Sequence, residues 1–416
     1  MIAWQPAKAE RLGDPALAVR LLARAAAAAP GNAVLHAKLG NCHLDRFDFC
    51  NAAPAFEAAL RLDPRVSEVR VRLARCWNRL GRHADVLALL ADASTSGGPI
   101  SDALPLEAGA ALAADLSCQE GVAARALGRT AAAEAAFRRT LARDPHHRTA
   151  CFELGRILRD GGRSADLDAL HADLWERGVR HAQLLLDRGR ASALAGDEAF
   201  ARRLLFGPAR VDATTIAPPD AYGGLAAFNA AVAADLIGNR HAITDVPTDE
   251  LAMRGAARVH HLMNGDRPDL LRALLAAIQA AVDRHVAALV EAAPADIEES
   301  DPWLAALPPR ARLAPWGLIQ KSGDYEDWHT HRGGWLSGVY YIQVPEPFST
   351  AGDGAGCIEF GPPPSLVAPG RVPCAPLRIA PREGLLLLCP SHYHHRTIPF
   401  VSDRRRISFA FDVCPV

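Results

Sequence analysis

The feature that most constrains the fold of this chain is a spaced pattern of small and aromatic residues in its first part. Two stretches carry the same spacing of glycine, alanine, phenylalanine and proline: Gly40, Ala52, Phe56 and Pro64 in the first, and Gly121, Ala133, Phe137 and Pro145 in the second. The surrounding sequence, from Asp14 to about Arg180, is rich in Ala, Leu and Arg and has helical periodicity. Small residues allow two helices to approach closely, and a proline ends the second helix. The pattern therefore predicts helix pairs that stack on one another.

This spacing resembles the tetratricopeptide repeat. A weaker unit contains Leu73 and Trp77, and residues 18–30 match the second helix of a truncated repeat. The resemblance implies an α-solenoid, which we assign to residues 1–200. Stacked repeats of this kind form a concave groove for a peptide or protein. The alternative is a helical scaffold that only stabilises or assembles the protein.

Composition narrows the class of protein. The chain has 416 residues, enough for two or three domains, and 50% of them are hydrophobic. The formal net charge is −1, so the basic surface typical of a nucleic-acid-binding protein is not expected. No apolar stretch at the start has the length of a signal peptide, and the alanine-rich runs are broken by charges, so no membrane span is expected.

The cysteines indicate a compartment. The chain has nine cysteines, scattered and without a Cys-x-x-Cys pair. Such a set is typical of buried thiols in a reducing environment. We therefore expect a cytoplasmic location.

A change of composition predicts a domain boundary. Between residues 201 and 220 the sequence becomes rich in Pro, Thr and Gly. We assign residues 201–416 to a second domain, with a helical lead-in at 221–300 and a β core at 313–416. Residues 225–236 and 269–291 are expected to be helices on the outside of the sheet.

Two histidines, His329 and His331, stand one residue apart just before a long apolar segment that is predicted to be a buried strand. In an extended segment, side chains two residues apart point to the same side, roughly 6 to 7 Å apart, so both could face one ion. A third histidine, His395, lies in the C-terminal segment. The last segment alternates apolar residues with a second set, namely Arg406, Ser408, Ala410 and Asp412, which therefore share one face.

The segments HTHRGGWLSGVYYIQVP, CPSHYHHRTIPF and RRISFAFDV resemble a bacterial branch of the iron(II)- and 2-oxoglutarate-dependent oxygenases. The resemblance implies a double-stranded β-helix, also called a jelly-roll or cupin-like fold, with flanking helices. It further implies Fe(II) held by His329 and His395, with 2-oxoglutarate and O₂ as cosubstrates. Arg406 and Ser408 then anchor the far carboxylate of 2-oxoglutarate, since a guanidinium can make two parallel bonds to a carboxylate. Neutral imidazoles suit Fe(II).

One position departs from the family pattern. His331 occupies the place where the family has Asp or Glu, and three interpretations remain open. His331 is a third nitrogen ligand, or water fills the position, or a nearby carboxylate binds the metal; the candidates are Asp324, Glu326 and Asp327. Our hypothesis places His331 at the metal. A vacant carboxylate position would also leave room for a halide, so halogenation stays an option.

Other residues near these segments are assigned lesser roles. Tyr341 and Gln320 are candidates to face the pocket and the cosubstrate. His392 and His394 are expected to point away from the metal, because they flank His395.

The predicted architecture is a multidomain α + β protein that hydroxylates a side chain of a peptide or protein substrate presented by the repeats. The alternative is a non-catalytic or zinc-binding cupin-like module, with the repeats as a protein-interaction scaffold. The sequence does not determine the substrate or the oligomeric state.

Overall fold

The computed structural model describes residues 2–5, 15–95, 106–216, 222–239, 242–243, 253–260, 262–345, 348, 350, 352–361 and 375–416. These residues form two compact units. The repeat unit is Gly13–Val179, and the C-terminal unit combines Met1–Leu12 with Arg180–Val416. The multidomain α + β class is thus confirmed, with a helical N-terminal part and curled sheets in the C-terminal part.

The division differs from the predicted boundary at residue 200 in two places. Helices α10 (Ala182–Ala195) and α11 (Glu198–Leu205) belong to the C-terminal unit. The chain after α11 is fastened there because Phe206 packs edge-on against Tyr393, with ring centroids 5.7 Å apart. The N-terminal strand β1 (Ala3–Trp4) also lies in this unit, parallel to the start of β6. A strand this short gives no periodicity from which it could be predicted.

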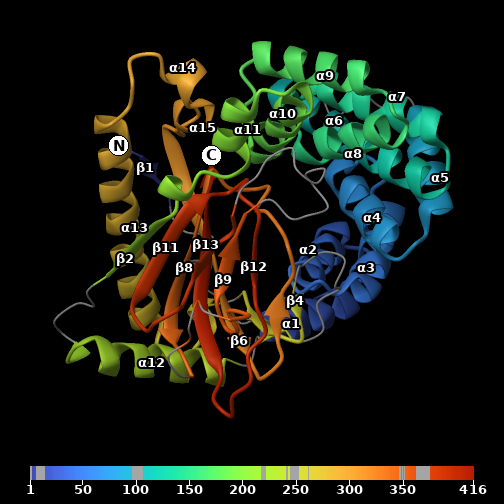
Figure 1. The fold of residues 1–416 in the computed structure, drawn as a ribbon. Helices are drawn as coiled ribbons and strands as arrows, with labels where there is room; N and C mark the ends of the chain where they lie inside the picture. The colour runs from blue at the N-terminus through green and yellow to red at the C-terminus, as the bar shows by residue number, and fades with distance from the viewer. Residues whose placement is uncertain are drawn as a thin grey trace. The chain divides into compact units, whose positions relative to one another are not determined.

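The repeat unit is built from antiparallel helix neighbours (Figure 1). Its described helices are α1 (Pro15–Ala28), α2 (Ala33–Leu44), α3 (Phe49–Leu62), α4 (Ser67–Arg79), α5 (His83–Thr95), α6 (Leu106–Ala126), α7 (Thr130–Arg143), α8 (Arg148–Asp160) and α9 (Ser164–Glu176). Side chains cap the N-termini of several of these helices. The Asn32 carboxamide accepts from two backbone N–H groups of α2, and the Asp48 carboxylate accepts from the backbone N–H of Asn51 in α3.

The glycines of the spaced pattern lie where two helices touch. A Cβ atom on Gly40 of α2 would be 2.6 Å from the ring of Phe56 on α3. In the second pair, a Cβ on Gly121 of α6 would be 2.6 Å from the ring of Phe137 on α7. Both rings are fully buried. The spacing seen in the sequence therefore reports one repeated packing contact, glycine on one helix against phenylalanine on the next.

The C-terminal unit contains three sheets. The large sheet has the order β2-β11-β8-β13-β6-β5-β3, with β1 added beside β6; the smaller ones are β10-β9-β12 and β4-β7. The strands are β2 (Asp212–Thr215), β3 (Ala242–Ile243), β4 (Met253–Arg254), β5 (Ala257–Val259), β6 (Arg310–Gln320), β7 (Tyr325–Glu326), β8 (Leu336–Gln343), β9 (Ile358–Phe360), β10 (Leu377–Ile379), β11 (Leu385–Pro390), β12 (His395–Thr397) and β13 (Arg406–Pro415). The strands curl around a shared interior, in agreement with the predicted jelly-roll-like domain.

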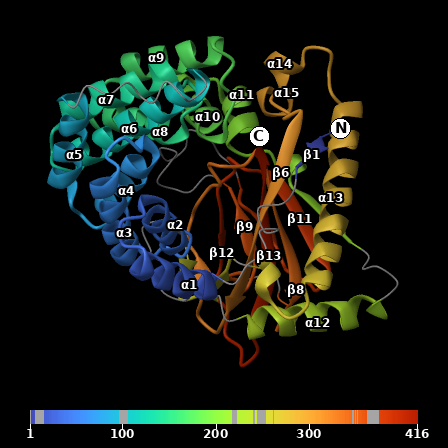
Figure 2. The same ribbon diagram turned by 180° about the vertical axis from the view of Figure 1, so that it is seen from behind.

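Helices cover one face of the large sheet, as predicted. Helix α12 (Leu225–Gly238) packs on β8, where the Tyr340 hydroxyl donates to Asn229 Oδ1 at 2.8 Å. Figures 1 and 2 show α12 crossing one end of the strands and α13 (Pro268–Glu291) running along them. The short helices α14 (Ile297–Ser300) and α15 (Pro302–Ala305) lead into β6.

Among the described residues, α13 is the one helix whose length and composition would allow it to cross a membrane. Its apolar residues form a stripe with helical spacing, and the stripe is buried: Leu270, Leu274, Ile278, Val282 and Val286. The helix is also bonded to the N-terminal strand, because the Trp4 indole N–H donates to the Asp283 carboxylate at 3.0 Å. A buried stripe with a polar opposite face is typical of a helix packed on a domain.

Replacing Gly121 with leucine tests the repeated packing contact. The added side chain would overlap the buried Phe137 ring, and overpacking of this kind costs about 1 to 3 kcal/mol. We expect Gly121→Leu to lower the urea midpoint of the helical signal in circular dichroism of the full chain. Gly31→Ala is the control, because no atom lies within 4 Å of its added Cβ. Equal midpoints for the two variants would show that the ring moves aside.

Candidate metal centre

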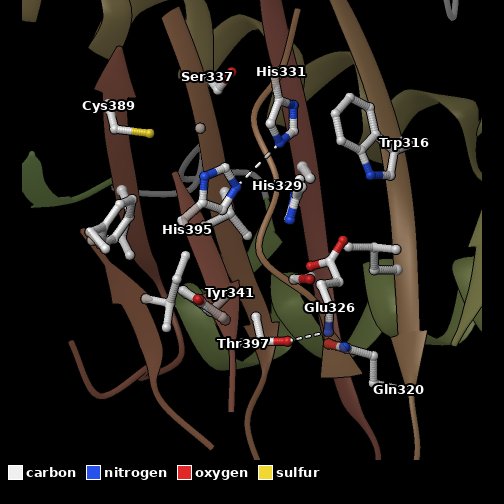
Figure 3. A pocket seen from close by; sticks show the side chains of 18 of the residues that line it. Trp316, Gln320, Glu326, His329, His331, Ser337, Tyr341, Cys389, His395 and Thr397 are labelled. Atoms are coloured by element: carbon white, nitrogen blue, oxygen red, sulfur yellow. Dashed lines mark hydrogen bonds between the residues drawn. The ribbon is translucent and has the colours of Figure 1, made fainter. Parts of the chain in front are cut away.

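Three histidines from different segments face one point. His329 and His395 form an isolated antiparallel bridge, with reciprocal backbone hydrogen bonds of 3.0 and 3.1 Å. The backbone N–H of His331 donates to the carbonyl of Ser391 at 2.8 Å, which fastens the next residues of the loop beside β11. One nitrogen from each of the three rings lies within 4.8 Å of the others. Figure 3 shows the rings converging at one end of a pocket.

The hydrogen bonds of the three rings select the same tautomer. His329 Nδ1 lies 2.7 Å from the carbonyl oxygen of Asp327, and His395 Nδ1 lies 3.1 Å from that of Tyr393. A carbonyl oxygen can only accept, so each Nδ1 carries the proton and each Nε2 presents a lone pair. His331 Nδ1 is 2.7 Å from Asp412 Oδ1, a carboxylate that likewise accepts.

The distance between two of these lone pairs fits a shared ion. His331 Nε2 and His395 Nε2 are 3.2 Å apart. Two nitrogens that are each about 2.1 Å from one ion lie about 3.0 to 3.4 Å apart, depending on the angle between them. Without a cation or a proton between them, two lone pairs at this distance repel. The donor set therefore fits a divalent transition metal such as Fe(II).

Burial favours the neutral form of two of the three histidines, which is the form that binds a metal. Burial lowers the pKa of His329. Burial, together with the neighbouring histidines, holds the pKa of His395 well below its ordinary value. Burial also opposes protonation of His331, but the Asp412 carboxylate outweighs this effect and raises the pKa of His331. In turn His331 holds the pKa of the buried Asp412 carboxyl below its ordinary value.

Strand pairing places the rest of the pocket. In the antiparallel register, Arg406 of β13 lies opposite Gln320 of β6, Ser408 lies opposite Tyr341 of β8, and Asp412 lies opposite Ser337 of β8. Arg406 and Asp412 are six residues apart on one face of one strand, about 20 Å at 3.3 Å per residue. The pocket thus has a histidine end near Asp412 and an arginine end at Arg406.

The arginine end contains a buried cation, and some of the N–H donors there have no hydrogen-bond acceptor among the described residues. The Arg406 side chain is 1% exposed; its Nε donates to Gln320 Oε1 at 2.9 Å and its Nη1 to the carbonyl of Gly356 at 2.7 Å. Among the described residues, Arg406 Nη2 and Gln320 Nε2 have no hydrogen-bond partner. Burial lowers the pKa of Arg406, which remains a cation. A buried, partly unsatisfied cation is costly unless an anion binds beside it.

The predicted site residues all line this pocket: His329, His331, His395, Arg406, Ser408, Tyr341 and Gln320. Apolar side chains such as Leu318, Ile358 and Phe360 form walls between its two ends. Burial raises the pKa of the Tyr341 hydroxyl, which therefore stays protonated as a donor. The roles of these residues remain predictions, but the structure brings all seven together.

The three carboxylates proposed as alternative ligands differ in whether they line the pocket. Glu326 lines the pocket, whereas Asp324 accepts from the backbone N–H of Lys321 and Asp327 accepts from that of Trp328. The Glu326 side chain is not among the groups that converge with the histidines. His392 and His394 do not line the pocket, as expected; burial lowers the pKa of each to about 3.

The residue that sequence reasoning missed is Asp412. The alternation of the last segment places Asp412 on the same strand face as Arg406 and Ser408, but predicts no function for it. A carboxylate on the buried face of the last strand was the available indication, because buried charges are paired.

Comparison with protein families agrees with the architecture. Residues 314–412 match the family described as "Putative 2OG-Fe(II) oxygenase". Residues 43–97 and 118–166 match two families described as "Tetratricopeptide repeat". The chain therefore joins tetratricopeptide repeats to a C-terminal domain of the 2-oxoglutarate and iron(II) oxygenase type. No curated protein matches the chain.

Several solved structures resemble part of the chain. A MamA fragment from Desulfovibrio magneticus RS-1 is 16% identical and covers 39% of this chain and 85% of its own, with a TM-score of 0.33. PilF of Pseudomonas aeruginosa is 19% identical and covers 46% and 81%, with a TM-score of 0.37. YrrB, described as a TPR protein with an unusual peptide-binding site, is 16% identical and covers 45% and 90%, with a TM-score of 0.33.

Removing one imidazole tests the metal centre. We expect His395→Ala to lose high-affinity binding of Co(II), measured by its visible absorption, because two nitrogens replace three. The matched control is His394→Ala, which removes the neighbouring imidazole that does not line the pocket. Circular dichroism establishes that each variant folds. Retained affinity in His395→Ala, or an equal loss in both variants, would contradict the assignment.

Proposed function

We propose that the C-terminal unit is an Fe(II)- and 2-oxoglutarate-dependent dioxygenase that hydroxylates a C–H bond. In the overall reaction, one O₂ oxidises 2-oxoglutarate to succinate and CO₂ and places one oxygen atom in the hydroxylated product. The observation that supports this function best is the two-ended pocket, with three Nε2 lone pairs at one end and the open donors of Arg406 at the other. The match of residues 314–412 to the oxygenase family agrees with it.

The chain's own residues have distinct tasks in this proposal. His329, His331 and His395 would hold the iron, which supplies the oxidising chemistry. Arg406 would bind the far carboxylate of 2-oxoglutarate, with the free amide N–H of Gln320 and the Ser408 hydroxyl beside it. The apolar walls exclude water from the space between the two ends.

The position of His331 favours hydroxylation over halogenation. One of its ring nitrogens lies within 4.8 Å of a ring nitrogen of each of the other two histidines. His331 would therefore take the coordination position that a halide needs. A zinc-binding module would also be satisfied by three nitrogens. It would leave the buried cation at the arginine end without a function, so the second end of the pocket favours the oxygenase.

Arg406→Lys tests the cosubstrate assignment. Lysine keeps the charge and loses the planar fork, and the loss of a charged hydrogen bond costs about 1.5 to 3 kcal/mol. Apparent affinity for 2-oxoglutarate should fall by roughly tenfold or more. The measurement is anaerobic titration of the Fe(II)-loaded full chain with 2-oxoglutarate, followed by the weak visible band of the bidentate complex. Unchanged affinity in a folded variant would move the anchor elsewhere, and absence of the band in the parent would contradict the proposed function.

The substrate is proposed to be a peptide or protein segment bound by the repeats. Repeats of this type form extended binding surfaces, and remote binding energy can be used to position a reacting group. The competing hypothesis is that the repeats only stabilise or assemble the protein.

The Gly121→Leu variant separates these hypotheses. Candidate peptides should stimulate 2-oxoglutarate consumption by the parent, and the variant should lose the stimulation because its helix packing is disturbed. Its peptide-independent consumption should persist, which shows that the iron site is intact. Equal stimulation of parent and variant, once the variant is shown to have disturbed repeats, would count against a substrate-binding role.

A further inference from the structure

The three histidines differ in the partner of the nitrogen that faces away from the metal. For His329 and His395 this partner is a neutral peptide carbonyl. For His331 it is the Asp412 carboxylate, at 2.7 Å. His331 is also the ligand that stands where the oxygenase pattern has Asp or Glu. The one ligand that replaces a carboxylate is therefore the one that is hydrogen-bonded to a carboxylate.

Asp412 is held in place by a chain of hydroxyl groups. The Ser337 hydroxyl donates to Asp412 Oδ1 at 2.7 Å, and the Ser337 and Ser391 hydroxyl oxygens are 2.7 Å apart. Two groups, His331 Nδ1–H and Ser337 O–H, thus donate to the same oxygen, Asp412 Oδ1. The Asp412 side chain is only 14% exposed, so water screens its charge little.

The loop and the sheet around His331 are shaped to keep this contact. A Cβ atom on Gly334 would lie 2.4 Å from Ser391 Oγ and 3.2 Å from Asp412 Cβ, so the loop after His331 can pass over the pair only with glycine there. On its other side the His331 ring stacks on Trp316, with centroids 5.5 Å apart and planes at 19°. The ring is therefore fixed by packing as well as by hydrogen bonds.

Building on the proposed function, we propose that Asp412 is a positioning residue that supplies negative charge to the metal through His331. A carboxylate that accepts from Nδ1–H fixes the tautomer and raises the basicity of Nε2 more than a peptide carbonyl does. In this centre the negative charge is not on a ligand itself. It is on Asp412 of β13, which is hydrogen-bonded to the ligand His331. The His331 and Asp412 pair then replaces a single Asp or Glu ligand.

Asp412→Asn separates charge from geometry. The asparagine oxygen can still accept from His331 and Ser337, whereas the negative charge is lost. We expect Co(II) to bind the full-length metal-free variant roughly tenfold to hundredfold more weakly than the parent, as judged by competition with a chelator. The control is Asp327→Asn, which neutralises a carboxylate two residues from His329. The variant keeps the backbone carbonyl of residue 327, the group that accepts from the His329 ring. Its affinity should match that of the parent.

The outcomes distinguish this inference from the function on which it rests. If the parent does not bind Co(II), the metal centre itself is refuted. If the parent binds and Asp412→Asn binds equally well, only the role of Asp412 is overturned. A folded metal-free state, established by circular dichroism and thermal melting, is required for each variant.

A double variant gives a second, independent readout. His331→Asp alone would set two carboxylates close together, and like charges at one site oppose joint ionisation. We expect this variant to bind Co(II) poorly and His331→Asp with Asp412→Asn to recover affinity by about tenfold or more, because the repulsion is removed. A double variant that binds no better than His331→Asp would overturn the pairing of the two positions.

Discussion

The site depends on the register of β13 between β6 and β8. This strand is bonded on both sides. Arg406, Ser408 and Ala410 line the pocket, and Asp412, on the same strand face, is bonded to the pocket residue His331. A shift of one residue would turn this set to the opposite face and present apolar residues such as Ile407 and Phe411 to the pocket instead. The alternation of polar and apolar residues resists such a shift, since Phe409 and Phe411 are fully buried on the other face. One strand register therefore positions both ends of the pocket.

The two ends of the pocket are electrostatically opposite, and both favour ligands. The arginine end has a buried cation with unsatisfied donors, which favours an anion. The histidine end has three lone pairs and one buried carboxylate, which favours a cation. In the proposed function, a metal together with a dicarboxylic oxo acid would satisfy both ends at once. Such buried polar groups are costly in their absence, so the site is specified for ligands more than for stability.

Local patterns predicted much of the fold. Residues 225–236 and 269–291 were expected to be helices and lie in α12 and α13, and the alternation of the last segment matches β13. The repeat spacing corresponds to real glycine–phenylalanine contacts. Each of these rests on a period of 3.6 or 2 residues, which the sequence displays directly. The predicted boundary at residue 200 differs from the division into two compact units, because α10 and α11 have helical periodicity like the repeats. These two helices pack on each other, whereas Phe206, directly after α11, packs on the distant Tyr393.

The sequence by itself determined the classes of both parts, the His-x-His pair, and the shared face of Arg406 and Ser408, because these depend on neighbours along the chain. Only the tertiary structure decided that His395 meets that pair and that the Nε2 atoms face one another, because these contacts join segments more than sixty residues apart. It also decided that the Asp412 carboxylate accepts a hydrogen bond from His331. The alternation of β13 places the Asp412 carboxylate on one face of the strand. Its partner there, His331, lies on the loop between β7 and β8, which the alternation of β13 cannot predict.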